Sequence, residues 1–213
     1  MSTSAKKPLP IAVLISGTGR SLKNLIEKIR AGELDAEIRL VIASTSRAYG
    51  LQYAEMANIP IKIIERSSFD SDEAFSREVF KHCTEKKVRY VIMAGYLRLL
   101  TIPEEYEGRV VNIHPSLIPA FCGKGMYGHR VHEEALRYGV KVSGCTVHFV
   151  NNHYDDGPVI LQKVVPVFSS DTPQTLNDRV FYDAECVAYP EAIQLLAEER
   201  VHLNGRKVII DEQ

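Results

Sequence analysis

Two side chains that can take part in acyl chemistry lie two residues apart in the segment Asn112-Ile113-His114-Pro115-Ser116. An apolar run, Val110–Ile113, leads into this segment and is typical of a buried strand. Residues two apart on a strand point to the same side, and Pro115 cannot continue a central strand. We therefore expect Asn112 and His114 to face one crevice at the carboxyl end of a strand, where open α/β sheets bind ligands.

An amide and an imidazole in one crevice suit the transfer of an acyl group to an amine. The amide N–H₂ group can stabilise the oxyanion of a tetrahedral intermediate, and histidine can exchange protons near neutral pH. A carboxylate could orient the imidazole or relay protons, and Asp155 and Asp156 in a polar loop are candidates. Taken alone, Asn112 and His114 are more simply explained as a turn cap and a satisfied core histidine.

A second candidate site is the glycine loop Ser16-Gly17-Thr18-Gly19-Arg20-Ser21, which lies between a strand-like run and a helical pattern. Glycines let the backbone turn tightly and approach an anion, and the N-terminus of the following helix supplies free N–H groups. Arg20 and Ser21 add a charge and a donor, so the loop predicts a monophosphate site; a tight turn without a ligand is the alternative. A dinucleotide site is disfavoured, because Leu22 replaces the third glycine of that fingerprint and Ala43-Ser44 offers no acidic residue after the second strand.

Apolar runs alternate with helical patterns, which predicts an α/β fold: a mainly parallel sheet with right-handed crossovers and helices on both faces. The expected strands are Ile11–Ile15, Ile38–Ala43, Ile61–Ile64, Tyr90–Ala94, Val110–Ile113, Ser143–Val150 and Val159–Val167. The expected helices are one that follows the glycine loop and ends at Gly32, then Leu51–Asn58, Asp70–Lys86, Arg130–Tyr138 and Thr172–Glu199, the last with a break near Pro190. Asp70 and Glu73 suit a capping box, and Asn204-Gly205 suits a type I′ hairpin turn.

Length and composition fit a single domain over residues 1–213, with residues 1–9 as a flexible lead-in. Of its 213 residues, 45% are hydrophobic and 25% charged, which is ordinary for a globular protein with one core. The net charge of −1 gives no basic excess for nucleic acid, and no apolar stretch is long enough to span a membrane. The four cysteines, at positions 83, 122, 145 and 186, form no paired motif, which favours a reduced, cytoplasmic compartment.

Three motifs together resemble the folate-dependent formyltransferases. They are N-I-H-P-S-L-I-P at 112–119, G-C-T-V-H-F-V at 144–150 and D-D-G-P-V-I-L-Q at 155–162. The resemblance extends from the first strand to the region of Glu185 and implies the Rossmann-like formyltransferase fold. It also implies direct passage of a formyl group from 10-formyltetrahydrofolate, the co-substrate, to the amine of glycinamide ribonucleotide in purine biosynthesis, with no metal.

The same resemblance implies roles for residues at matching positions. Asn112 would stabilise the oxyanion, His114 would take part in proton transfer, and Asp155 would position His114 and relay the proton. The ribonucleotide would be held by Gly17, Thr18, Gly19, Arg20, Ser21 and Glu185. The folate would be bound by Met93, Arg98, Leu99, Leu100, His148 and Val150.

Several positions depart from the family's usual pattern. They are Arg20-Ser21 in the phosphate loop, Asn152 in place of an acidic residue, Asp72 where some members have an arginine, a longer stretch at Phe121–His129, and one extra residue between Arg179 and Glu185. These departures concern ligand binding more than the reaction itself.

Other functions share parts of this pattern. A hydrolase of 10-formyltetrahydrofolate usually has an N-terminal regulatory domain, and we expect none because the first strand begins by residue 11. Formylation of methionyl-tRNA would need a C-terminal nucleic-acid-binding domain, and a nucleotide-sugar formyltransferase is less similar. A non-catalytic nucleotide-binding module would not need Asn112, His114 and Asp155 together. We expect small-molecule substrates, no nucleic acid and no membrane as partners, and leave open a homodimer.

Three further features have simpler explanations. His129 and His132 have a spacing that can bind a metal, but no third ligand is evident, so a solvated or packing role is expected. Cys122 lacks an identifiable partner base and is expected to be a bystander. Tyr96 would either line the pterin pocket or pack in the core.

Overall fold

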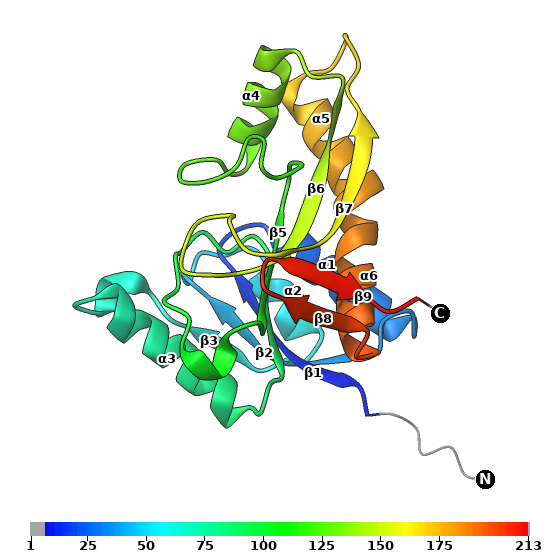
Figure 1. Ribbon diagram of the computed structural model, residues 1–213. Helices are drawn as coiled ribbons and strands as arrows, with labels where there is room; N and C mark the ends of the chain where they lie inside the picture. The colour runs from blue at the N-terminus through cyan, green and yellow to red at the C-terminus, as the bar shows by residue number, and fades with distance from the viewer. Residues whose placement is uncertain (1–6, 213) are drawn as a thin grey trace.

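A computed structural model describes residues 7–212 of the chain (Figure 1). Its main sheet contains β1 (Leu9–Ile15), β2 (Ala36–Ala43), β3 (Ile61–Ile63), β4 (Tyr90–Met93), β5 (Val110–His114), β6 (Val142–Phe149) and β7 (Val159–Pro166). The strand order is β3-β2-β1-β4-β5-β6-β7. The first five strands are parallel, whereas β6 pairs antiparallel with β5 and β7 pairs antiparallel with β6. The mainly parallel α/β architecture expected from the sequence is confirmed.

The helices connect these strands and cover both faces of the sheet. They are α1 (Arg20–Arg30), α2 (Leu51–Met56), α3 (Asp72–Glu85), α4 (His129–Tyr138), α5 (Pro173–Arg179) and α6 (Cys186–Ala197), with 3₁₀ turns η1 (Arg66–Ser68) and η2 (Glu104–Tyr106) and a π-helical segment η3 (Val180–Glu185). A separate hairpin follows, formed by β8 (Val201–Asn204) and β9 (Lys207–Ile210). Of the lead-in expected over residues 1–9, residues 1–6 lie outside the described residues, and Leu9 already belongs to β1.

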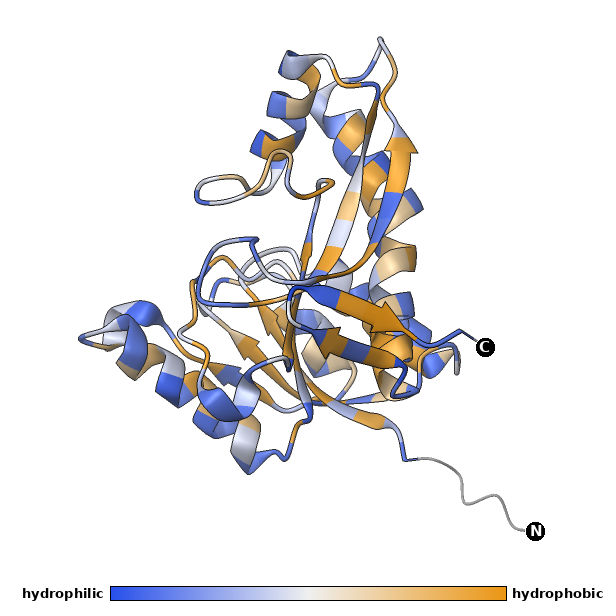
Figure 2. Ribbon diagram, in the orientation of Figure 1, coloured by the Kyte–Doolittle hydropathy of each residue, from blue (hydrophilic) through white to orange (hydrophobic). Residues whose placement is uncertain are grey.

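The side chains of β1 alternate between two hydrophobic cores, as the period of a strand requires. Ile11, Val13 and Ile15 pack in one core with residues of α1, α2, α4, α5 and α6. Ala12 and Leu14 pack in the other core, which α3 covers with its buried face of Phe75, Val79, Phe80 and Cys83. The strands are accordingly coloured as mainly hydrophobic, while α3 carries hydrophilic residues on its outer side (Figure 2).

Two turns differ from the sequence expectation by one residue. Ser71, and not Asp70, is the N-cap of α3, because its side chain accepts the hydrogen bond from the backbone N–H of Ala74 at 3.1 Å. In the hairpin, Asn204 pairs with Lys207, so the turn residues are Gly205 and Arg206 instead of Asn204 and Gly205. Both differences arise because a cap or turn residue is chosen by local backbone bonding, which adjacent polar residues can satisfy equally well.

The long closing helix is irregular, although not where proline predicted a break. Pro190 lies inside α6 and cannot donate to the carbonyl of Cys186, one turn earlier. That carbonyl accepts a hydrogen bond from the Asn24 side chain at 3.0 Å instead, so the helix continues. The irregularity is η3, a π-helical segment whose turn holds one residue more than an α turn, and it lies where the sequence pattern predicts one extra residue between Arg179 and Glu185.

Candidate active site

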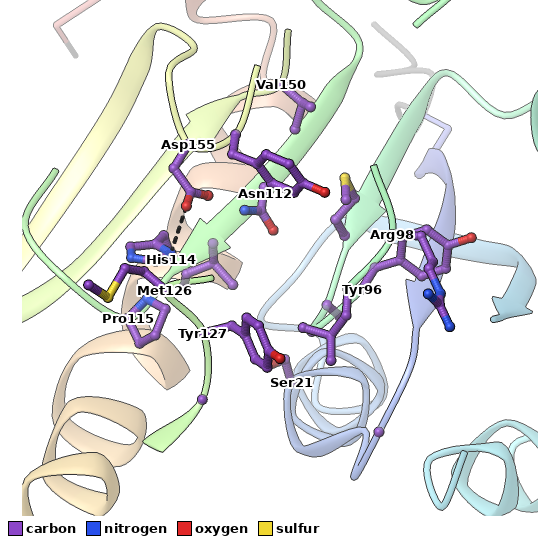
Figure 3. Close-up of a pocket in the computed structure, with 18 of the residues that line it drawn as sticks. Ser21, Tyr96, Arg98, Asn112, His114, Pro115, Met126, Tyr127, Val150 and Asp155 are labelled. Carbon is purple, nitrogen blue, oxygen red and sulfur yellow. Dashed lines mark ion pairs between the residues drawn. The ribbon is translucent and has the colours of Figure 1, made fainter. Parts of the chain in front are cut away.

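A cleft of about 610 Å³ opens at the carboxyl ends of β1, β4 and β5 (Figure 3). Its walls also include the loops at 123–128 and 150–155 and side chains of α5 and η3. The residues to which the resemblance assigned a catalytic, ribonucleotide-binding or folate-binding role all line this one cleft: Gly17, Thr18, Gly19, Arg20, Ser21, Met93, Arg98, Leu99, Leu100, Asn112, His114, His148, Val150, Asp155 and Glu185. The fold therefore brings these residues together, and their individual roles remain predictions.

His114, at the end of β5, is 3% exposed and is held by two acceptors. Its Nε2 lies 2.9 Å from the carbonyl oxygen of Phe121, and its Nδ1 lies 3.4 Å from Oδ2 of Asp155. A protonated imidazole would donate to both. A neutral imidazole can donate to only one of them.

Asp155 rather than Asp156 is the carboxylate that faces this histidine. Asp155 has a left-handed backbone conformation, with φ of 50°, and its Oδ2 accepts the backbone N–H of Gly123 at 2.9 Å. Asp156 turns away and accepts from the side chains of Asn151 and Arg206. The sequence left these two neighbours as equal candidates, and the loop conformation separates them.

Asn112 is paired with His148 across the antiparallel strands β5 and β6. Nδ1 of His148 donates to the carbonyl of Phe149 at 2.8 Å, so its Nε2 is free to accept from the Asn112 amide at 3.3 Å. Burial lowers the pKa of His148, which favours the neutral form of this ring. His148 thus fixes the Asn112 amide, and the second amide hydrogen of Asn112 is left for the cleft.

The glycine loop forms one end of the cleft. Gly19 has φ of 70° and is the N-cap of α1. The guanidinium of Arg20 donates to Asp178 at 3.2 Å and to Asn177 at 3.5 Å, and it lies 4.0 Å above the ring of Phe181. Arg20 consequently joins the loop to α5 and η3.

Glu185 lies at the C-terminal end of η3 and lines the same end of the cleft. Burial raises the pKa of its carboxyl to about 7, and the charge of Arg20 acts in the opposite direction. This end of the cleft therefore combines backbone N–H groups with a carboxyl group that titrates near neutral pH.

The other end of the cleft is apolar. Met93, Tyr96 and Leu100 are buried there, whereas Arg98 is exposed at the rim. Tyr96 lines the cleft and also packs against the α3 side of the sheet. Its hydroxyl is buried without a hydrogen-bond partner.

The sequence reasoning missed several residues that line the cleft. They are His153, Tyr154, Asn177, Phe181 and the loop residues Gly123–Gly128. The glycines at 123, 125 and 128, all with positive φ, were the available signal that this loop folds back tightly. Tyr127 and Met126 of this loop line the cleft together with Ser21 and Pro115 (Figure 3).

The two histidines considered as metal ligands have different surroundings. His132 is fully buried on α4, where burial lowers its pKa to about 4, and His129 is exposed. Within residues 7–212, no three His, Cys, Asp or Glu side chains are arranged to hold a metal ion. No helix in the same range is long and apolar enough to cross a membrane.

Comparison with known proteins agrees with this geometry. Residues 9–193 match the model of the formyl transferase family, so the chain belongs to that family. The resemblance stated from the three motifs is thereby confirmed.

Two of the similar proteins are named for formyl transfer to glycinamide ribonucleotide, and a third is named for purine biosynthesis. Glycinamide ribonucleotide transformylase 1 from Symbiobacterium toebii is 38% identical, with a TM-score of 0.90 over 97% of this chain and 95% of that one. The chloroplastic phosphoribosylglycinamide formyltransferase of Vigna unguiculata is 35% identical over 90% of this chain. The trifunctional purine biosynthetic protein adenosine-3 of Homo sapiens is 40% identical over 98% of it. The chain spans 62% of the Vigna protein and 20% of the human one.

Proposed function

We propose that this protein transfers the formyl group of 10-formyltetrahydrofolate to the amine of glycinamide ribonucleotide. The observation that carries the proposal is the meeting of Asn112, His114 and Asp155 in a cleft with a glycine loop at one end and an apolar wall at the other. A phosphorylated amine and a pterin need these two different ends. The names of the similar proteins support glycinamide ribonucleotide as the formyl acceptor.

The reaction needs an oxyanion site and a route for one proton. The acceptor amine attacks the formyl carbon, a C–N bond forms, and the carbonyl oxygen becomes an oxyanion. The free amide hydrogen of Asn112 and a protonated His114 would stabilise that charge. Collapse breaks the bond from carbon to N10 of the folate, while the amine loses a proton and N10 gains one. Asp155, 3.4 Å from His114, would hold the imidazole in place and relay the proton.

The two ends of the cleft would bind the two substrates separately. The backbone N–H groups of Gly17–Ser21 and the N-terminus of α1 would hold the phosphate. The hydrogen bonds from Arg20 to Asp178 and Asn177 would keep this loop in place. Glu185 would accept hydrogen bonds from the ribose. Met93, Leu99, Leu100 and Val150 would form the walls for the pterin, with Arg98 at the rim and His148 behind Asn112.

The release of tetrahydrofolate, followed spectroscopically with and without glycinamide ribonucleotide, tests the proposal. We expect release only when the amine is present, together with formation of N-formylglycinamide ribonucleotide. Release that does not depend on the amine would instead identify a hydrolase of 10-formyltetrahydrofolate. Absence of release under both conditions would contradict both functions.

We also propose a cytoplasmic location and a homodimer. The four cysteines are free thiols, which suits a reducing compartment. Val164 on the edge strand β7 and Leu203 and Ile209 on the hairpin are exposed apolar side chains that a second copy would cover. Sedimentation velocity at micromolar concentration checks the dimer, and a single species of 23.9 kDa would contradict it.

A further inference from the structure

We propose that the backbone turn Ser116–Gly123 sets the tautomer of His114, and that Ser116 is the positioning residue that holds this turn. The inference deepens the proposed function, on which it rests, because it assigns the atom at which His114 exchanges protons. That atom is Nδ1.

Both neighbours of the His114 ring accept hydrogen bonds, and they lie at different distances: the carbonyl of Phe121 is 2.9 Å from Nε2, whereas Oδ2 of Asp155 is 3.4 Å from Nδ1. The shorter contact assigns the single hydrogen of the neutral ring to Nε2. The lone pair of the neutral ring is then on Nδ1, which faces Asp155. A proton arriving at the histidine binds at Nδ1 and leaves from there, while Nε2 keeps its hydrogen throughout.

The same turn also holds Asp155. The backbone N–H of Gly123 donates to Oδ2 of Asp155 at 2.9 Å, and this is the oxygen that faces Nδ1 of His114. One short segment therefore contacts both members of the pair, with an acceptor on the histidine and a donor on the carboxylate. Its position determines the separation between them.

A hydrogen bond from the Ser116 side chain holds the turn in this position. The Ser116 side chain is 1% exposed, and its hydroxyl donates to the carbonyl of Ala120 at 2.6 Å and lies 3.4 Å from that of Phe121. Phe121 itself has φ of 49°, a left-handed conformation that a bulky residue adopts only when its surroundings hold it there. The Ser116 bond closes the turn next to this residue.

The other end of the turn is fixed to the sheet. The hydroxyl of Thr146 on β6 donates to the carbonyl of Ser116 at 2.7 Å and accepts from the backbone N–H of Ile118 at 3.0 Å. Gln162 on β7 donates to the carbonyl of Ile118 at 3.0 Å. The turn is thus tied to two strands at its start and to the His114–Asp155 pair at its end.

The tautomer of His114 can be measured directly in the free enzyme. Protein labelled with ¹⁵N-histidine gives two-bond ¹⁵N–¹H correlations that distinguish Nε2–H from Nδ1–H rings, and a His114→Gln variant assigns the signals. We expect neutral His114 to carry its hydrogen on Nε2. A hydrogen on Nδ1, or an equal mixture, in the wild-type protein would overturn the proposal.

The role of Ser116 is tested by comparing Ser116→Ala with Ser76→Ala. Ser76 is also 1% exposed, and its hydroxyl donates to the carbonyl of Asp72 on α3 at 2.7 Å and accepts the backbone N–H of Thr101 at 2.9 Å, so the control loses buried hydrogen bonds away from the turn. We expect Ser116→Ala to lower kcat about tenfold or more, to leave both KM values within about twofold, and to mix the two His114 tautomers. Ser76→Ala should keep kcat and the tautomer.

Equal effects of the two substitutions on kcat, or an unchanged tautomer in Ser116→Ala, would reduce Ser116 to a structural role and contradict the proposal. If Ser116→Ala does not fold, the wild-type spectrum still decides the tautomer. The spectrum needs no substrate, so a wild-type enzyme that fails to formylate the amine would refute the proposed function while leaving the Nε2–H result standing.

Discussion

Asp155 and Asp156 provide a matched pair of carboxylates for testing the proton route at the scale of single residues. Asp155 faces His114, whereas Asp156 is paired with Asn151 and Arg206 outside the site. We expect Asp155→Asn and His114→Ala each to lower kcat by about 10²- to 10⁴-fold without unfolding the protein. Asp156→Asn should change kcat less than about twofold. Steady-state rates with circular dichroism as a fold check decide this, and an unchanged rate for Asp155→Asn would remove it from the mechanism.

Glu185 should make stability depend on pH. Its folded pKa, raised by burial to about 7, exceeds the 4.5 of a free carboxyl. The folded state therefore holds a proton that the unfolded state has lost, and the free energy of unfolding falls as the pH rises from about 4.5 to about 7. We expect a loss of about 2 kcal/mol between pH 5 and pH 8 that is absent in Glu185→Gln. Urea unfolding at both pH values measures it, and equal pH dependence in both proteins would contradict the assignment.

The position of a single residue could be predicted where it follows the regular repeat of a strand or helix, and not where it lies in an irregular loop. Asn112 and His114 were placed correctly because the two-residue repeat of a strand fixes their common side. The choice between Asp155 and Asp156 depended on one left-handed residue in an irregular loop, which no period encodes. The contact of Phe121 with His114 uses a backbone carbonyl, which every residue type has, so the sequence carries no signal for it.

Among the contacts between elements, the close approach of Gly19 and Gly50 lets the glycine loop pack against the N-terminus of α2. A Cβ on Gly50 would lie 2.8 Å from Cα of Gly19 and 3.0 Å from Cδ1 of Ile15, although the φ of Gly50 is −62°. The N–H of Gly50 also donates to the carbonyl of Gly17. We expect Gly50→Ala to displace the loop, with a loss of about 1–3 kcal/mol in stability and a higher KM for the ribonucleotide only.

Gly17→Ala is the control for the stability measurement, because a Cβ on Gly17 would meet no atom within 4 Å. We expect its free energy of unfolding to stay within about 0.5 kcal/mol of the wild-type value. If Gly50→Ala is as stable as Gly17→Ala and binds the ribonucleotide normally, the close approach has no consequence for the site.

The π-helical segment η3 should tolerate the loss of one residue. Tyr182 lies in η3 and is 61% exposed. Its deletion removes the surplus residue and leaves a regular α-helix with α5 and α6 in their present phase. Deletion of Lys81 from the regular helix α3 would instead rotate part of its buried face by about 100°. We expect the first variant to fold and the second to unfold, as thermal melts would show. The opposite order would disprove this account of η3.

The elements themselves were predicted closely, and the failures have a common cause. Strands and helices were found to within a few residues because each buries a periodic apolar face. The break at Pro190 was wrong because the carbonyl that proline leaves unpaired is satisfied by Asn24, a residue far away in the sequence. The π-helical segment η3 was not predicted either, because its additional residue does not interrupt the repeat of apolar residues in the sequence. Tertiary bonding therefore decides where these helices bend.

The cleft joins parts of the chain that are distant in sequence, so both substrates should stabilise the whole molecule. The glycine loop and the segment that follows β4 belong to the first half of the chain. The loop at 123–128, Asp155 and Glu185 belong to the second half. At 100 times its dissociation constant, either substrate adds about 2.7 kcal/mol to the free energy of unfolding. That corresponds to a rise in Tm of roughly 5–10 °C for a chain of this size.

Substitutions at the two ends of the cleft show whether these sites are separate. With tetrahydrofolate as the unreactive folate, Arg98→Ala should reduce the rise in Tm caused by the folate and leave that caused by glycinamide ribonucleotide. Glu185→Gln should do the reverse, because it lies at the glycine-loop end of the cleft. Differential scanning fluorimetry with each ligand alone measures both effects. If each substitution weakened both ligands equally, the cleft would be a single shared site, and the proposed division into a phosphate end and a pterin end would be wrong.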